Sequence, residues 1–254
     1  MLTWYKADLH IHTVLSPCAD LSMGPVNIVN TAIKNNLDII AITDHNSAEN
    51  VQTVMQVAQN TPLNVIPGME VYTREDAHMI CLFENLETVL QFQDFVYQHL
   101  QPGIYDASMM GPQYVCDQHE NVIAENDRFL TLPTNASVEA VAARVNDLGG
   151  IIYPAHIDRK SNSLLRSLGF IPDNLFIHAV EISQPFDQAR ERLRFLNNTP
   201  YTIITASDSH DIDMLGSKTT FFYLEQPTFG EIKKAIEKQD GRYTALQQAE
   251  QSEN

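Results

Sequence analysis

The chain has 254 residues and a mass of 28.6 kDa, a size that suits one α/β barrel domain. Hydrophobic residues make up 44% of the sequence and charged residues 19%, so the chain can bury a large core, and wholesale disorder and a coiled coil are excluded. The formal net charge of −16 at pH 7 repels nucleic acid and anionic membranes, so we expect neither a long nucleic acid nor a membrane as a partner.

Strand-length apolar runs alternate with helix-length amphipathic segments, a pattern that predicts a mostly parallel sheet covered by helices. The predicted strands are, in chain order, 5–11, 38–43, 64–71, 78–83, 151–154, 179–183, 201–206 and 219–224. The predicted helices are 25–36, 48–60, 86–100, 138–148, 186–197 and 228–238. We therefore expect residues 1–245 to form one domain.

Several boundaries have a physical basis. Pro25 suits the first turn of a helix, because backbone N–H groups there have no acceptor within the helix and the N–H that proline lacks is not needed. Ser137 can cap the helix that follows it, and Gly149 can end that helix at positive φ.

The regular alternation breaks between residues 101 and 135, where Pro102-Gly103 and Gly111-Pro112 mark turns. We expect this stretch to be an insertion or lid over the scaffold. The polar tail, residues 246–254, is expected to be disordered.

The cysteines and the termini carry less information. Cys18, Cys81 and Cys116 are widely spaced and odd in number, so neither a disulfide framework nor a thiolate zinc cluster is predicted. No apolar run has the length of a membrane span, and the first residues do not resemble a signal peptide. We therefore expect a cytoplasmic protein; nothing in the sequence indicates its oligomeric state.

The placement of the histidines carries most of the functional information. His10 and His12 are two residues apart on a predicted strand, so both rings leave the same face and can converge on one metal ion. A single His-x-His pair is more often a solvated or core pair than a metal site. The other histidines therefore decide between the two interpretations.

Metal-type side chains follow the other apolar runs as well. They are His45, Glu70, His156, Asp208 and His210. Taken singly, each has an ordinary explanation, such as a turn histidine or an exposed edge glutamate. Because strand ends meet at one rim of a barrel, together they predict an active site there.

Two further residues are less secure on sequence grounds. Asp20 lies in a loop that can bend back toward His12, although it is equally compatible with an ordinary loop aspartate. His78 begins an apolar run and would reach the rim only if its strand runs antiparallel to its neighbours. Cys18 could touch a metal, but a loop or buried thiol is the favoured interpretation.

These residues resemble the ordered motifs of the PHP (polymerase and histidinol phosphatase) superfamily of metal-dependent phosphoesterases. The resemblance covers roughly residues 6–210. It rests on Asp8-Leu9-His10-Ile11-His12, Thr43-Asp44-His45, Gly68-Met69-Glu70, Pro154-Ala155-His156 and Ser207-Asp208-Ser209-His210.

The resemblance implies a distorted TIM-like (β/α)7 barrel with two or three divalent ions. The implied ligands are His10, His12, Asp20, His45, Glu70, His78, His156, Asp208 and His210. The first ion would be shared by His10, His12, Glu70 and Asp208. Glu70 would bridge to a second ion, completed by His78 and His156, and Asp20, His45 and His210 would hold the third.

Nitrogen and oxygen ligands favour manganese, iron or zinc over copper. One bound water could attack phosphorus while the ions neutralise the phosphate oxygens. Asp8 and Asp44 are candidates to orient a histidine or relay a proton. Arg159 is the first candidate to bind the substrate phosphate, and the remaining candidates are Lys160, Arg74 and Lys218.

The leading hypothesis is a hydrolase for a small phosphate monoester, such as a sugar, nucleotide or amino-alcohol phosphate. A nuclease for short oligonucleotides is a second hypothesis, and it would require a basic groove. A regulatory domain that uses metals only for stability is the third.

Overall fold

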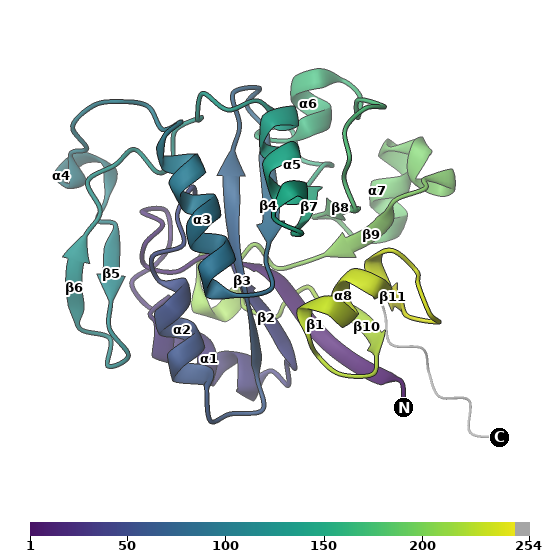
Figure 1. The fold of residues 1–254 in the computed structure, drawn as a ribbon, viewed down its shortest axis with the longest axis horizontal. Coiled ribbons are helices and arrows are strands. Elements are labelled where there is room, and N and C mark those ends of the chain that lie inside the picture. The colour runs from purple at the N-terminus through teal and green to yellow at the C-terminus, as the bar shows by residue number, and fades with distance from the viewer. Residues whose placement is uncertain (247–254) are drawn as a thin grey trace.

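A curled seven-stranded sheet forms the centre of the fold (Figure 1). The computed structural model describes residues 1–246, so the predicted disorder of residues 247–254 lies outside the described residues. In spatial order the strands are β11 (Tyr243–Ala245), β10 (Thr220–Leu224), β1 (Thr3–Ile11), β2 (Ile39–Ile42), β3 (Asn64–Tyr72), β4 (His78–Leu82) and β7 (Ile151–Pro154).

The prediction of a mostly parallel sheet is wrong for this sheet. β1 pairs with β2 and β2 with β3 in parallel, but β3–β4, β4–β7, β1–β10 and β10–β11 are antiparallel. The segment between Tyr72 and His78 is too short for a crossover helix, so β4 turns back along β3. This reversal places His78 beside Tyr72, at the same end of the sheet as Glu70.

A second, parallel pair continues the curl. β8 (Ala179–Ile182) lies beside β9 (Thr202–Thr205). The amide of Ile157, just after β7, donates to the carbonyl of Glu181 on β8 at 2.9 Å. Beyond β9, the amide of His12 donates to the carbonyl of Ser209 at 3.1 Å, which brings the chain back to β1. The strands thus form the predicted distorted TIM-like barrel.

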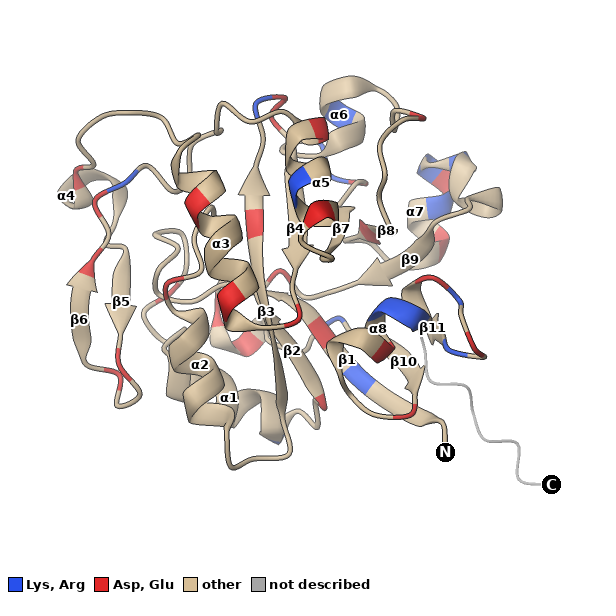
Figure 2. Cartoon of the chain, viewed as in Figure 1, with Lys and Arg blue, Asp and Glu red and all other residues tan. Residues whose placement is uncertain are grey.

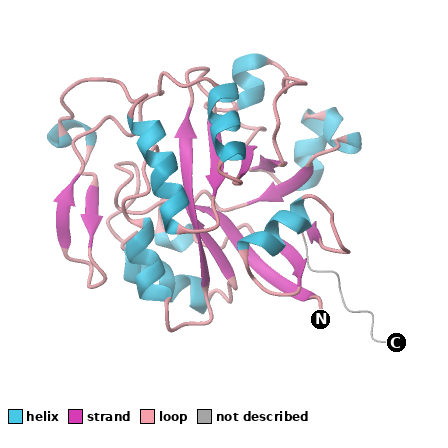
Figure 3. Cartoon of the chain, viewed as in Figure 1, coloured by secondary structure: helices cyan, strands magenta, loops and turns pink. Residues whose placement is uncertain are grey.

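Helices cover the outside of the sheet, as Figure 3 shows. They are α1 (Pro25–Lys34), α2 (Val51–Ala58), α3 (Leu86–Tyr97), α5 (Val138–Asp147), α6 (Leu164–Leu168), α7 (Phe186–Arg192) and α8 (Phe229–Ile236). Pro25 begins α1, and the Ser137 side chain caps α5 by accepting from the amide of Ala140, both as predicted. The predicted helix 186–197 instead ends at Arg192 and continues as a 3₁₀ helix, Arg194–Asn198.

The segment 101–135 forms a small unit beside the main sheet. It contains α4 (Ala107–Met110) and the hairpin of β5 (Tyr114–Cys116) and β6 (Val122–Glu125), which forms a separate two-stranded sheet. The side chain of Asn50 anchors it, because its Nδ2 donates to the carbonyl of Tyr114 and its Oδ1 accepts from the amide of Cys116.

The core is divided between the two faces of the sheet. Met69 and Val71 of β3 pack with residues of α1, α2, α3 and α5 in one buried cluster. Glu70 lies between them in the strand and therefore points to the opposite face. Among the described residues, no helix has both the length and the apolar character needed to span a lipid bilayer.

Candidate metal centre

Glu70 is the centre of the site. Its carboxylate is completely buried, and five histidine rings approach it. The ring nitrogens lie 2.9 Å (His45 and His78), 3.2 Å (His10) and 3.4 Å (His12 and His156) from its oxygens. These rings come from strands and strand ends that are far apart in the sequence.

A close approach of strands positions Glu70. A Cβ at Gly68 would lie 2.8 Å from a side-chain carbon of Leu82 on β4 and 2.9 Å from that of Thr43 after β2. Such distances exclude a side chain at this position without movement of its neighbours. Gly68 therefore lets β3 fit tightly between β2 and β4, two residues before Glu70.

Asp208 is the second carboxylate of the site. Its Oδ1 lies 3.1 Å from Nε2 of His10 and 3.3 Å from Nε2 of His12. Asp208 and His156 both have positive φ, at 52° and 29°. Such conformations are costly for residues other than glycine and concentrate at functional sites.

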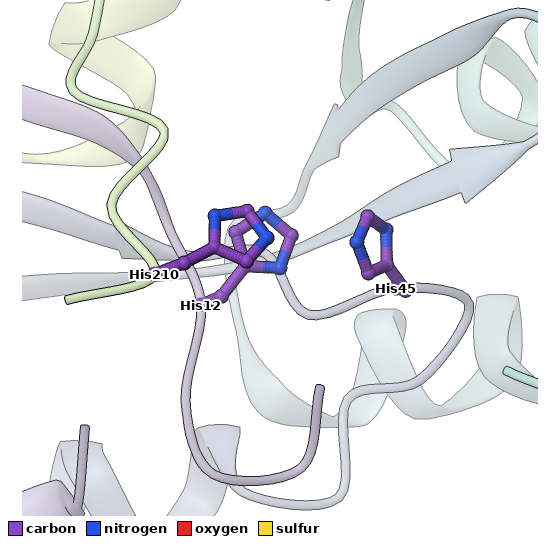
Figure 4. A group of neighbouring side chains, drawn as sticks. All are labelled: His12, His45 and His210. Atoms are coloured by element: carbon purple, nitrogen blue, oxygen red, sulfur yellow. The ribbon is translucent and has the colours of Figure 1, made fainter. Parts of the chain in front are cut away.

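His12, His45 and His210 form one group within the cluster (Figure 4). Each offers one ring nitrogen, and these three nitrogens lie within 4.8 Å of one another. The rings of His12 and His210 stack with their centroids 4.0 Å apart. Ligand atoms of His10, His12 and Asp208 also lie within 4.8 Å of one another, and so do those of His45, Glu70 and His78.

Of the nine residues predicted to bind metal, eight lie in this cluster and Asp20 does not. Asp20 is exposed, and its Oδ1 accepts from the amide of Ser22 at 2.8 Å. The thiol of Cys18, two residues earlier, lies near the rings of His210 and His45. Burial opposes ionisation of this thiol, but these two contacts bring its pKa down to about 6.

The buried atoms of the cluster fit metal ions. Nδ1 of His45 and Oε2 of Glu70 are 2.9 Å apart, yet both are buried without a hydrogen-bond partner. Nδ1 of His156 is also buried and unpartnered. Buried polar atoms without partners are costly, and lone pairs that face one another are compensated by a cation between them. The donor set is imidazole nitrogen and carboxylate oxygen, which suits Zn, Fe and Mn.

The charges of the cluster are strongly coupled. Burial favours a neutral Glu70, but the rings of His78, His10 and His45 hold its pKa well below the usual range. Burial and the neighbouring rings of His210 and His45 lower the pKa of His12 well below its usual value. His12 is therefore neutral at pH 7 and has a lone pair to offer.

Two buried networks fix the histidines of β1. Nδ1 of His10 lies 3.2 and 3.1 Å from the two oxygens of Glu181 on β8. Nδ1 of His12 lies 3.1 Å from Oγ of Ser16, whose hydroxyl donates to Oδ1 of Asp44 at 2.7 Å. Glu181 beside His10, and a Ser16 hydroxyl that donates its proton to Asp44, favour a proton on Nδ1 of each ring, which would leave Nε2 free to bind an ion in the cluster.

Asp8 and Asp44 have different roles. Asp44 is connected to His12 through Ser16, and its orienting role remains a prediction. Asp8 accepts instead from the amides of Ser207, at 3.0 Å, and Gly216, at 2.8 Å. Burial raises the pKa of Asp8 to about 6, although both hydrogen bonds oppose this shift. Asp8 thus anchors the segment that carries Asp208 and His210.

A cavity of about 190 Å³ opens onto the cluster. It is lined by His45, Glu70, His78, His156, Arg159, Ser161, Asn162, Asp208 and His210. Arg159 forms an ion pair with Asp208. Among the described residues, it is the only Lys or Arg that lines this cavity.

The other predicted phosphate-binding residues lie elsewhere. Lys160 is exposed, and Arg74 pairs with Glu75 on the surface. Lys218 lines a separate cavity next to β8.

Sequence reasoning did not identify Glu181, Ser16 or Asn162 as site residues. Nδ2 of Asn162 lies 3.2 Å from Nε2 of His78. A signal for Glu181 is present in the sequence, because a carboxylate inside the apolar run 179–183 needs a buried partner, as Glu70 does.

Comparisons with known proteins agree with this geometry. The family model of the PHP domain matches residues 8–238. The uncharacterised protein YqxK of Bacillus subtilis is 28% identical over 157 residues, which are 55% of this chain and 40% of that protein. The uncharacterised protein MJ1587 of Methanocaldococcus jannaschii is 34% identical over 88 residues, 32% of this chain and 51% of that protein. The chain thus spans about half the length of these relatives or less.

Among solved structures, the lesion-specific endonuclease PfuEndoQ of Pyrococcus furiosus has a TM-score of 0.73 and 21% identity. The match covers 95% of this chain and 58% of the endonuclease. A candidate metal-dependent phosphoesterase of Bifidobacterium adolescentis has a TM-score of 0.54 and 17% identity, over 80% of this chain and 87% of that one. These likenesses show a shared fold.

Proposed function

Because the chain belongs to the PHP domain family, we propose that it is a metal-dependent phosphoesterase that hydrolyses a small phosphate monoester. Sugar phosphates, nucleotides and amino-alcohol phosphates fall within this class. The observation that carries the proposal is the convergence of histidines and two buried carboxylates, Glu70 and Asp208, beside one small cavity. Divalent ions bound there would supply an activated water molecule and neutralise the charge on the phosphate oxygens.

Two or three ions fit the number of groups in the cluster. Nε2 of His10 and of His12, together with Asp208, would hold the first ion, and Glu70 would bridge it to the second. His78 and His156 would complete the second ion. Manganese, iron and zinc all accept this donor set, and the metal supply of the cell would select among them.

The side chains around the ions would position the substrate. Arg159 would exchange its contact with Asp208 for two phosphate oxygens, which its planar guanidinium can bind together. Ser16 and Glu181 would hold the protons on Nδ1 of His12 and His10 throughout, so that Nε2 stays available.

The size and charge of the site support a small substrate. The cavity of about 190 Å³ holds a phosphate and a few further atoms. Acidic residues are spread along the chain (Figure 2), and the net charge of −16 disfavours a long polyanion.

Release of inorganic phosphate from a panel of monoesters tests this proposal. With added Mn²⁺ or Zn²⁺ we expect turnover that chelation abolishes and that Asp208→Asn lowers by more than about 100-fold. The exposed His119 lies outside the cluster, so His119→Ala is the matched control and should keep full activity. Equal turnover by Asp208→Asn and the control would refute the proposal.

A nuclease is the second candidate function. The specific observation in its favour is the fold shared with PfuEndoQ and with Endonuclease Q, whose structure in complex with a 27-mer duplex has an abasic lesion at the active site. Labelled duplex with and without an abasic site, incubated with excess metal-loaded enzyme, distinguishes the two. Cleavage of DNA without turnover of any monoester would select the nuclease. If neither is hydrolysed, a regulatory domain that uses metals for stability becomes the better explanation.

A further inference from the structure

Asn162 contacts His78 at two points. The backbone amide of His78 donates to the carbonyl of Asn162 at 3.0 Å, and Nδ2 of the Asn162 side chain lies 3.2 Å from Nε2 of the His78 ring. Both residues line the cavity that opens onto the cluster. Among the described residues, the His78 ring is the hydrogen-bond partner of the Asn162 side chain. This amide is therefore directed at one nitrogen of one expected metal ligand.

The backbone around Asn162 fixes where this amide lies. Asn162 has a φ of 54°, in the left-handed region that Asn, Asp and Gly adopt at lower cost than other residues. Its neighbour Ser163 anchors the segment, because its hydroxyl donates to the carbonyl of Arg159 at 3.0 Å and its Oγ accepts from the amide of Arg166 in α6. Asp or Gly can therefore replace Asn162 and leave the backbone as it is.

The other side of the His78 ring faces Glu70. Nδ1 of His78 lies 2.9 Å from Oε1 of Glu70. A donor beside Nε2 and a carboxylate beside Nδ1 favour a ring proton on Nδ1, with the lone pair of Nε2 facing Asn162. In this arrangement both ring nitrogens are engaged. His78 can offer Nδ1 to an ion next to Glu70 only when its proton is on Nε2, where the NH₂ group of Asn162 would repel it.

We propose that Asn162 is the positioning residue that makes His78 a metal ligand: its side-chain amide turns so that Oδ1 accepts the proton of Nε2 and Nδ1 keeps a lone pair beside Glu70. A half-turn about the Cβ–Cγ bond exchanges Oδ1 and Nδ2 with little change in shape, because the amide is planar. The ring proton passes from Nδ1 to Nε2, so the protein neither gains nor loses a proton. Metal-binding imidazoles almost always donate their other N–H to an acceptor of this kind. This inference rests on the proposed metal centre but not on the proposed reaction.

Zinc affinity, measured by competition with a chromogenic chelator, gives a readout that does not depend on activity. Asn162→Gly removes the acceptor and keeps the backbone, so one zinc ion should bind about 10–100-fold more weakly. Asn162→Asp offers only acceptor oxygens to Nε2, so it should bind zinc at least as tightly as the unmodified protein. The double variant Ser161→Asp, Asn162→Gly adds the same charge one residue away, on the same cavity, and should stay as weak as Asn162→Gly.

Nitrogen-15 NMR of labelled histidine rings completes the test, with the His78 signals assigned by their absence in His78→Gln. In the zinc-loaded unmodified protein and in Asn162→Asp, the ring proton of His78 should lie on Nε2 and exchange slowly with water. In Asn162→Gly the same proton should exchange faster, because no side chain accepts it.

Equal zinc affinities of Asn162→Gly and the unmodified protein would overturn the inference. So would a His78 ring that keeps its proton on Nδ1 when zinc is bound, or recovery of affinity in the double variant. Absence of phosphoesterase activity would leave the affinities and the NMR signals unaffected and would count only against the proposed function.

Discussion

Glu181 links two histidines of the cluster through one buried carboxylate. Both of its oxygens face Nδ1 of His10, and Oε1 also accepts from the backbone amide of His156 at 3.1 Å. A carboxylate behind a metal-binding histidine fixes the ring and its tautomer, and its loss typically lowers metal affinity or activity 10–100-fold. Glu181 is thus a positioning residue for His10.

The first prediction concerns Glu181→Gln. The amide can still accept from His156, but its NH₂ group would donate to Nδ1 of His10 and move the ring proton to Nε2, where the metal should bind. We expect about 10–100-fold weaker zinc binding with an unchanged fold. Competition with a chromogenic chelator measures the affinity, and circular dichroism checks the fold. Glu139→Gln, on the solvent side of α5, is the control, and affinities equal to that control would argue against the role.

The second prediction concerns Ser16→Ala. The hydroxyl joins the buried carboxylate of Asp44 to Nδ1 of His12, so its removal leaves both groups short of a partner. Loss of a hydrogen bond to a buried charged group costs about 1–3 kcal/mol. Urea unfolding should show this loss in Ser16→Ala and not in Ser217→Ala, an exposed serine without a side-chain partner among the described residues. Similar unfolding midpoints would contradict the role of this network.

At the scale of elements, much of the fold follows from local patterns. Short segments rich in apolar residues predict β2, β3 and β7, because a strand buried on both faces is mostly apolar along its length. Hydrophobic periodicity carries no information on strand direction, so the antiparallel direction of β4 could not be predicted. It could be named only as the condition under which His78 would reach the rim. Glu181 was missed because it lies inside an apolar run, whereas a rule based on strand ends selects only residues that follow such runs.

Asp20 shows the limit of motif spacing. Its loop is held by backbone hydrogen bonds, whose donors and acceptors every residue type except proline possesses, so the sequence does not reveal which side chain faces His210. In the structure the Asp20 side chain is exposed and accepts from the amide of Ser22 within its own turn. The convergence of the histidines could therefore be predicted where strands impose alternation, whereas the position of the Asp20 side chain in its loop could not.

The third prediction concerns the C-terminal unit of β10, α8 and β11. Arg242 binds the carboxylate of Glu231 at 2.9 and 3.1 Å and that of Glu225 at 3.2 Å. The hydrogen bonds from Arg242 lower the pKa of Glu231 to about 2. Because the folded pKa lies below the usual glutamate value of 4.5, this contact stabilises the fold above about pH 4.5, and its contribution is lost as the pH falls toward 2.

Arg242→Gln should therefore destabilise the protein at pH 6 and have progressively less effect toward pH 3. Urea unfolding at several pH values measures this trend. Arg190→Gln, whose exposed partner is Asp187, is the matched control and should change stability little at any pH. A constant difference between Arg242→Gln and the unmodified protein from pH 6 to pH 3 would contradict the assignment.

For the whole molecule, the metal centre connects segments from both ends of the sequence. His10 and His12 lie near the start of the described chain, and Asp208 and His210 lie beyond β9. An ion held by both regions would bind the native fold and not the unfolded chain, so the proposed metal binding would stabilise the fold.

The fourth prediction is a metal-dependent melting temperature. A ligand present at 100 times its dissociation constant stabilises the native state by about 2.7 kcal/mol. Zinc or manganese added to chelator-treated protein should therefore raise the Tm by several degrees. Asp208→Asn should lose most of this increase, whereas His119→Ala should keep it. Identical melting curves with and without metal in the unmodified protein would show that no such coupling exists.

Anomalous diffraction is the most direct test of the central claim that these histidines and carboxylates hold a cluster of divalent ions. Crystals of protein purified without chelator, measured at the zinc, iron and manganese absorption edges, should show two or three anomalous peaks. Each peak should lie about 2.0–2.3 Å from atoms of the cluster around Glu70 and Asp208. Crystals soaked in metal that show no peak there, or peaks only at surface histidines such as His119, would contradict it.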